Sequence, residues 1–168
     1  MNKVLSFFLI SVILMSCSDN DVVRSYWENG NIKSELRYKD DMLNGDCFWY
    51  FSNGKMDMKA HYNMNAMEGE VLRWYENGNL QSRYYIKNNQ YDSISELYNV
   101  FGTLVKVEHY KEGVLHGEYK QWYDSGKLFT EGSYNDGMLH GKWMMYYENG
   151  AVGSVATYEN GAGLQKGY

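Results

Sequence analysis

Apolar and polar residues alternate along most of the chain, and the alternation breaks at a glycine every 24 residues. Alternation with a period of two predicts half-buried β-strands, and the glycines predict turns between them. The six stretches that end on these glycines are YWENG at Gly30, YFSNG at Gly54, WYENG at Gly78, YNVFG at Gly102, WYDSG at Gly126 and YYENG at Gly150. A period without insertion or deletion predicts a repeat array in which each unit packs against its neighbours.

Four of the six stretches end on Asn-Gly. This dipeptide favours a two-residue type I′ hairpin, because both turn residues of that hairpin have positive φ, which asparagine and glycine adopt readily. The register that follows from this turn places Tyr38, Tyr62, Tyr110, Tyr134 and Tyr158 on one apolar face, together with the pairs Trp27–Ile32, Phe51–Met56, Tyr75–Leu80, Tyr123–Leu128, Tyr147–Val152, Tyr119–Gly132 and Trp143–Ala156. The predicted fold class is therefore all-β, an elongated single-sheet array of antiparallel β-hairpin repeats with about six units over residues 26–168.

The opposite face carries a second aromatic column, which we call the stripe. Its members are Tyr26, Tyr50, Trp74, Tyr98, Trp122 and Tyr146. The expected cross-strand partners are mostly polar: Lys33, Asp57, Gln81, Val105, Phe129 and Gly153. Rigid aromatic side chains with polar tips are favoured at binding surfaces, so the stripe is a candidate binding site. The alternative is a second core, buried because the sheet curls or dimerises.

The first residues have the pattern of an export signal. Lys3 precedes an apolar run from Val4 to Met15, which is shorter than the about 20 residues of a membrane-spanning helix. Its end, LMSC, resembles the lipobox of bacterial lipoproteins, so residues 1–16 are expected to be a lipoprotein signal peptide and Cys17 the lipidated residue. Residues 17–25 would be a short acidic tether. The alternative is a plain secretory signal followed by an incidental cysteine.

This N-terminus predicts a location in the bacterial cell envelope, with the chain anchored to the outer membrane by its lipid alone. The chain would lie on the periplasmic face or on the cell surface. With Cys17 acylated, Cys47 has no disulfide partner, and its place in an apolar column predicts a small buried side chain. The net charge of −5 and the interleaved signs offer no basic patch, which argues against nucleic-acid binding.

Catalytic motifs are missing from the sequence. His116 and His140 occupy equivalent places one repeat apart, about 10 Å on adjacent hairpins, which is too far to share one zinc ion. The chain has no phosphate-binding loop, nucleophile elbow or metal-spaced cysteine set. We therefore expect no catalytic residue, no metal, no cofactor and no enzymatic activity.

A second signature lies between the hairpins, clearest in GVLHGEY from Gly113 and GMLHGKW from Gly137. Together with the repeated NG turns it resembles the MORN-repeat variant family, over about residues 26–168. The resemblance implies a protein-binding β-repeat, and many members of the family are described as antitoxins of the YwqK type. The third unit departs from the pattern, with Ser93 in place of the connector glycine, Asn88–Asp92 in place of the usual turn, Ile86 in place of Tyr and Asn99 in place of an aromatic residue.

The sequence therefore predicts a non-catalytic envelope lipoprotein that acts as a protein-binding scaffold. A toxin is the candidate partner, which would make the chain an antitoxin or immunity factor. The alternative is a carbohydrate-binding or peptidoglycan-binding lipoprotein that stacks sugars on the Tyr and Trp side chains of the stripe.

Overall fold

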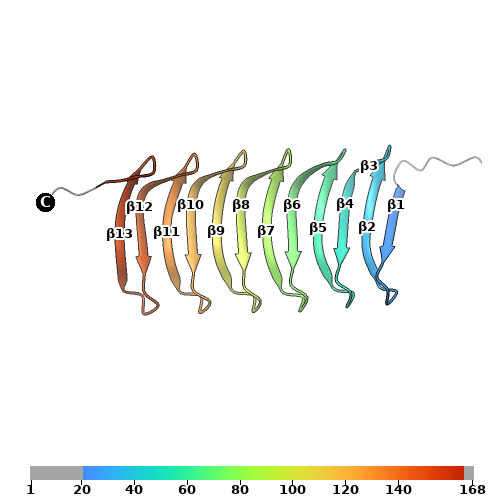
Figure 1. Cartoon of the computed structure of the whole chain (residues 1–168), viewed down its shortest axis with the longest axis horizontal. Coiled ribbons are helices and arrows are strands. Elements are labelled where there is room, and N and C mark those ends of the chain that lie inside the picture. Colours follow the sequence, from blue (N-terminus) through green and yellow to red (C-terminus); the bar gives the residue numbers. More distant parts are fainter. Residues whose placement is uncertain (1–20, 165–168) are drawn as a thin grey trace, which may run out of the picture.

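The computed structural model describes residues 21–164, and these form one open antiparallel sheet. Figure 1 shows the hairpins side by side in a single row, with β1 and β13 at opposite ends. The strands are β1 (Asp21–Tyr26), β2 (Ile32–Lys39), β3 (Met42–Leu43), β4 (Gly45–Tyr50), β5 (Met56–Asn63), β6 (Ala66–Trp74), β7 (Leu80–Lys87), β8 (Gln90–Tyr98), β9 (Leu104–Lys111), β10 (Val114–Trp122), β11 (Leu128–Asn135), β12 (Met138–Tyr146), β13 (Val152–Glu159) and β14 (Ala162–Gly163).

Consecutive strands are neighbours throughout the sheet, apart from the short β3, which pairs only with β2. The predicted all-β hairpin array is confirmed. The predicted signal peptide and Cys17 lie outside the described residues, and β1 begins at Asp21, within the range expected for the tether. In the part of the chain described, no helix is long and apolar enough to cross a membrane.

The Asn-Gly turns have a different geometry from the predicted type I′ turn. In the first turn the Gly30 amide donates to the Trp27 carbonyl at 2.9 Å, and the Trp27 amide donates to the Asn31 carbonyl at 2.8 Å. Gly30 has φ +86°, whereas Asn29 is not among the residues with positive φ. This is a three-residue loop, a type I turn closed by a glycine in the left-handed region. The same two bonds recur in all six turns.

The different turn changes the register next to it. Tyr26 pairs with Ile32 while Ser25 pairs with Ser34, so Lys33 is an extra residue in a β-bulge. The predicted partners of Trp27 and of the stripe are therefore wrong by one residue, here and in the equivalent hairpins. Beyond the bulge the two offsets cancel, because the longer loop and the bulge shift the register in opposite directions. The predicted pairs Tyr119–Gly132 and Trp143–Ala156 are confirmed.

The two-residue turns with positive φ lie at the other ends of the strands. We call the two rows of turns the two edges of the sheet. Lys39 pairs with Met42 across a loop in which Asp40 has φ +49° and Asp41 has φ +61°. This is the type I′ pattern. The equivalent loops are Met64-Asn65, Asn88-Asn89, Glu112-Gly113, Asp136-Gly137 and Asn160-Gly161. The Asp-Gly and Asn-Gly dipeptides of the last two loops are the sequence signal for these turns.

A larger bulge follows each of the first five type I′ turns. On β5 and β6, His61 pairs with Glu68 but Lys59 pairs with Leu72, so β6 contains two additional residues. Gly69 lies in this bulge with φ +84°. Gly45, Gly117 and Gly141 hold the same place with positive φ, and in the third unit Ser93 does so at φ +67°. The connector glycine is therefore a backbone requirement, and Ser93 occupies a conformation that side chains disfavour.

The asparagine of the Asn-Gly turns bonds through its side chain. Asn29 Oδ1 accepts from the Asn31 amide at 3.1 Å, and its Nδ2 donates to the Ser52 carbonyl of the next turn at 2.7 Å. Asn53 and Asn77 repeat this bond to the following turn at 3.1 and 2.8 Å. We call this series the asparagine ladder. The asparagine ladder joins the first four of these turns. It explains why asparagine occurs at a turn position where its φ is not positive.

The core lies on the face predicted to be apolar. One row of side chains crosses the middle of that face from strand to strand, and we call it the core row: Val23, Leu36, Cys47, Ala60, Val71, Tyr84, Ser95, Glu108, Tyr119, Gly132, Trp143 and Ala156. Cys47, Ala60 and Val71 are fully buried. The predicted role of Cys47 as a small buried side chain is confirmed, and burial raises the pKa of its thiol.

Candidate functional site

The stripe lies on the face opposite the core row. Tyr50, Trp74, Tyr98, Trp122 and Tyr146 are partly buried, and Tyr26, on the terminal strand, is 59% exposed. Among the described residues that alternation places on this face, only Val107 is buried, at 8% exposure. Within the single chain the stripe is therefore not a closed second core, because its rings remain accessible. Burial against a second copy of the sheet stays the alternative.

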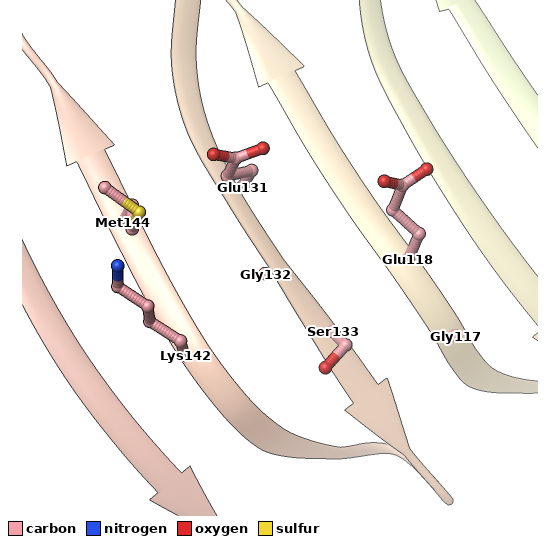
Figure 2. A pocket seen from close by; sticks show the side chains of 7 residues that line it. All are labelled: Gly117, Glu118, Glu131, Gly132, Ser133, Lys142 and Met144. Carbon is pink, nitrogen blue, oxygen red and sulfur yellow. The ribbon is translucent and has the colours of Figure 1, made fainter.

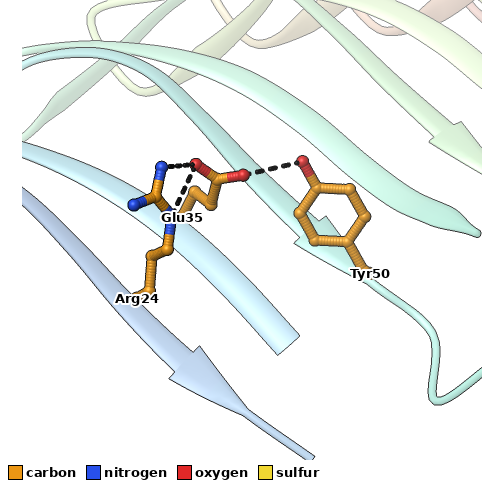
Figure 3. A network of polar contacts seen from close by, with 3 residues as sticks. All are labelled: Arg24, Glu35 and Tyr50. Atoms are coloured by element: carbon orange, nitrogen blue, oxygen red, sulfur yellow. Dashed lines mark hydrogen bonds and ion pairs between the residues drawn. The ribbon is translucent and has the colours of Figure 1, made fainter. Parts of the chain in front are cut away.

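Glutamates fix the tyrosine tips of the stripe. Figure 3 shows the first network, in which the Tyr50 hydroxyl donates to Glu35 at 3.4 Å. The other oxygen of Glu35 accepts from Arg24 at 2.9 and 3.1 Å. Burial raises the pKa of the Tyr50 hydroxyl, and the neighbouring Glu35 carboxylate raises it further. The hydroxyl therefore stays protonated as a donor, and the ring is held in one orientation.

Two more tyrosines of the stripe repeat this arrangement. Tyr98 donates to Glu96 at 2.8 Å, and Glu96 also binds the Arg83 guanidinium at 2.7 Å. Tyr146 donates to Glu131 at 2.6 Å, and this hydrogen bond is the main reason that the pKa of Tyr146 is raised. Such bonds to a charged acceptor are stronger than neutral ones. Three of the six rings of the stripe are thus held in a fixed orientation.

Aromatic residues that directly follow the stripe residues, at the start of the three-residue turns, support the stripe. The Tyr75 hydroxyl donates to the Tyr98 carbonyl at 2.9 Å, and the Tyr123 hydroxyl donates to the Tyr146 carbonyl at 2.8 Å. The Trp27 indole makes the equivalent bond to the Tyr50 carbonyl at 2.9 Å. These residues were predicted to be core pairs at the turn ends. They instead bind the backbone of the stripe residue in the next hairpin and fix its position.

A hollow of about 450 Å³ opens on the stripe face over β10, β11 and β12. Figure 2 shows its lining, with Glu131 and Ser133 on β11 between Glu118 on β10 and Lys142 on β12. The Ser133 hydroxyl is bound to the His140 carbonyl at 2.7 Å. Because Glu131 also binds Tyr146, the hollow adjoins the stripe and adds carboxylate, ammonium and hydroxyl groups to its C-terminal half.

Two of the four histidines pair with acids. His61 Nδ1 lies 2.8 Å from Asp46, and this hydrogen bond lowers the pKa of the Asp46 carboxyl. His116 Nδ1 lies 3.2 Å from Asp136 in the adjacent type I′ turn. Within residues 21–164, no three His, Cys, Asp or Glu side chains are close enough together to hold a metal ion.

Sequence analysis missed one exposed feature. Phe101, in the turn that departs from Asn-Gly, is 84% exposed, and Val100 beside it is 43% exposed. The turn is nonetheless ordered, because Asn99 Oδ1 accepts from the Phe101 and Thr103 amides at 3.1 and 3.0 Å. The sequence shows that YNVFG departs from the other turns. The exposure of Phe101 could not be predicted, because it follows from the three-residue loop.

Fold and surface define a class of protein, the antiparallel β-repeat scaffold with an aromatic face. Five segments match the MORN repeat variant family: residues 22–40, 43–64, 67–88, 115–136 and 139–160. The chain belongs to this family. Residues 89–114, which contain β8 and β9, lie between the matched segments. A comparison with curated proteins found no match.

Proposed function

We propose that the chain is a non-catalytic scaffold that binds a partner protein through the stripe. The observation that carries this proposal is the set of tyrosine rings whose hydroxyls are held by Glu35, Glu96 and Glu131 while the rings stay accessible. An aromatic ring already fixed in its bound orientation loses little conformational entropy on binding. Rows of such rings are typical of interface anchors.

The setting proposed for this scaffold is the bacterial cell envelope. Residues 1–16 would act as a lipoprotein signal peptide, and a lipid on Cys17 would anchor the chain to the outer membrane. In that setting the partner we favour is a toxin delivered from outside, and the chain would be its immunity factor. Cys17→Ser should move the protein from the detergent phase to the aqueous phase, and the parent chain should incorporate labelled fatty acid. Absence of label on the parent chain would contradict the anchor.

A carbohydrate or peptidoglycan strand is the second candidate ligand of the stripe. The hollow in Figure 2 supports it, because Glu118, Glu131, Ser133 and Lys142 offer acceptors and donors beside the Tyr146 ring. Sugar hydroxyls need both kinds of group, and the hydroxyls of Tyr50, Tyr98 and Tyr146 already donate to glutamates.

Truncation of the two tryptophans of the stripe tests the proposal. Trp74→Ala and Trp122→Ala should each weaken binding of the partner by more than about 1 kcal/mol, the scale of an interface anchor. The partner is first identified by cross-linking in envelope preparations, and binding is then measured with both purified proteins. The reference for a loss of stability is Tyr123→Ala, which removes the bond to the Tyr146 carbonyl and should lower the free energy of unfolding.

The outcome that would overturn the proposal is equally specific. If Trp74→Ala and Trp122→Ala lose as much unfolding free energy as Tyr123→Ala and bind the partner with unchanged affinity once folded, the stripe is structural. Binding of a soluble peptidoglycan fragment that depends on both tryptophans, without binding of any protein, would favour the second candidate.

A further inference from the structure

The core row is interrupted at one place. Ser95 faces Glu108 across β8 and β9, and Tyr84 and Tyr119 are the next members of the row on either side. Ser95 and Glu108 are the polar side chains of the row, since every other member is aliphatic, aromatic, cysteine or glycine. Polar groups in a core position destabilise the fold unless they are bonded, so such a pair in a regular repeat marks a candidate site.

A second hollow of about 450 Å³ opens at this interruption, on the face opposite the stripe. Its lining includes Arg73 on β6, Ser95 on β8 and Lys106 on β9. Serine leaves space where Val71 and Tyr119 occupy the equivalent places one repeat to either side. The small side chain is therefore what opens the core row to the surface.

Glu108 provides a fixed acceptor in this hollow. Its side chain is 14% exposed, and its carboxylate lies 3.1 Å from the Lys106 ammonium. The Tyr110 hydroxyl donates to the other carboxylate oxygen at 3.2 Å. Each carboxylate oxygen can accept two hydrogen bonds, so the group has capacity for further donors. Burial and the nearby Glu108 raise the pKa of Tyr110 to about 12, which keeps its hydroxyl protonated.

Three tyrosine rings form an aromatic wall beside the carboxylate. The centroids of Tyr84 and Tyr91 are 5.1 Å apart, and those of Tyr91 and Tyr110 are 5.0 Å apart. Tyr91 remains 41% exposed. Tyr91, Ser95, Glu108 and Tyr110 all lie in residues 89–114, the segment between the parts that match the family. Apart from Tyr84, the wall and the acceptor thus belong to the one unit that departs from the repeat.

We propose that this hollow binds a pyranose ring of a neutral oligosaccharide. The apolar C–H groups of a pyranose can pack on the exposed part of Tyr91, because the rings of Tyr84 and Tyr110 on either side cover it only partly. Its hydroxyls donate to Glu108 and accept from Lys106 and Ser95. A neutral ligand is indicated because the charged groups of the lining are already paired: Lys106 with Glu108, Arg73 with Asp57 and Glu96 with Arg83. The site goes beyond the proposed function, since it lies on the other face and needs neither the stripe nor a protein partner.

Isothermal titration of the full chain with cellohexaose and with chitohexaose tests the proposal. The parent chain should bind at least one of these probes. Ser95→Val restores the residue type found at Val71 and should lower the affinity at least about tenfold, equivalent to about 1.4 kcal/mol. The matched control is Ser154→Val, the same substitution on exposed β13, which should leave the affinity unchanged.

Circular dichroism checks that each variant is folded. If Ser95→Val does not fold, Tyr91→Ala, at a 41% exposed side chain, takes its place with the same expected loss. The proposal is overturned if the folded parent chain binds neither probe. It is also overturned if a folded Ser95→Val or Tyr91→Ala variant keeps the parent affinity, because binding would then occur elsewhere. Neither result bears on binding of a protein by the stripe.

Discussion

The turns at the two edges of the sheet both reverse the chain, but they differ in backbone conformation and in their bonds. At the edge with Gly30 and its equivalents, a three-residue loop places one glycine at positive φ, and asparagine side chains link successive turns. At the other edge, two residues with positive φ reverse the chain, and a glycine follows a few residues later in a bulge. Asparagine is common at both edges. At the first edge it bonds through its side chain without positive φ, whereas at the second Asn65 and Asn89 combine positive φ with side-chain bonds to the Leu43 and Met67 amides at 2.7 Å.

The glycine of the three-residue loop should be the most sensitive position. Gly126 has φ +82°, a conformation that β-branched residues resist. Gly126→Val should therefore destabilise the protein by about 1–3 kcal/mol, measured by chemical denaturation. Gly163, in β14, is not among the glycines with positive φ, and Gly163→Val should cost far less. Equal losses at the two glycines would refute the turn assignment.

Replacement of asparagine by glycine separates the two edges directly. Asn77→Gly removes the bonds to the Asn79 amide and to the Val100 carbonyl, so we expect a loss of about 1–2 kcal/mol. Asn88, in the type I′ loop, has φ +50°, which glycine adopts readily. Asn88→Gly should change stability by less than about 0.5 kcal/mol. If both variants behave alike in denaturation, asparagine has the same role at both edges.

The smallest expected effect is a gain. Ser93 replaces glycine in the connector bulge at φ +67°, so Ser93→Gly should stabilise the protein by about 0.5–1 kcal/mol through relief of strain. Gly117→Ala is the opposite change at the equivalent place, and its new Cβ would lie 3.2 Å from the Cβ of His109. It should lower the melting temperature. A Ser93→Gly variant less stable than the parent chain would show that the serine hydroxyl has a structural role.

The hairpin array and the distant pairs such as Tyr119–Gly132 could be predicted from the sequence, because both follow from the period and from alternation. The turn type could not. Asn-Gly is compatible with several turns, and the bond that selects asparagine at position 29 goes to a carbonyl 23 residues away. The face on which the stripe lies follows from alternation, but the bonds of its tyrosines to Glu35 and Glu131 depend on the register after the bulge. The hollow at Ser95 requires knowledge of both neighbouring strands.

The asparagine ladder also has a consequence for how the chain acquires its structure. Each bond of the ladder spans 23 residues, and the side-chain bond between Asn99 and Asp124 spans 25. Contacts this local give a low contact order, which favours rapid folding. A hairpin can therefore complete its bonds once one further repeat is present. A chain that crosses a membrane as an extended thread can form its sheet progressively, from the first repeat to emerge.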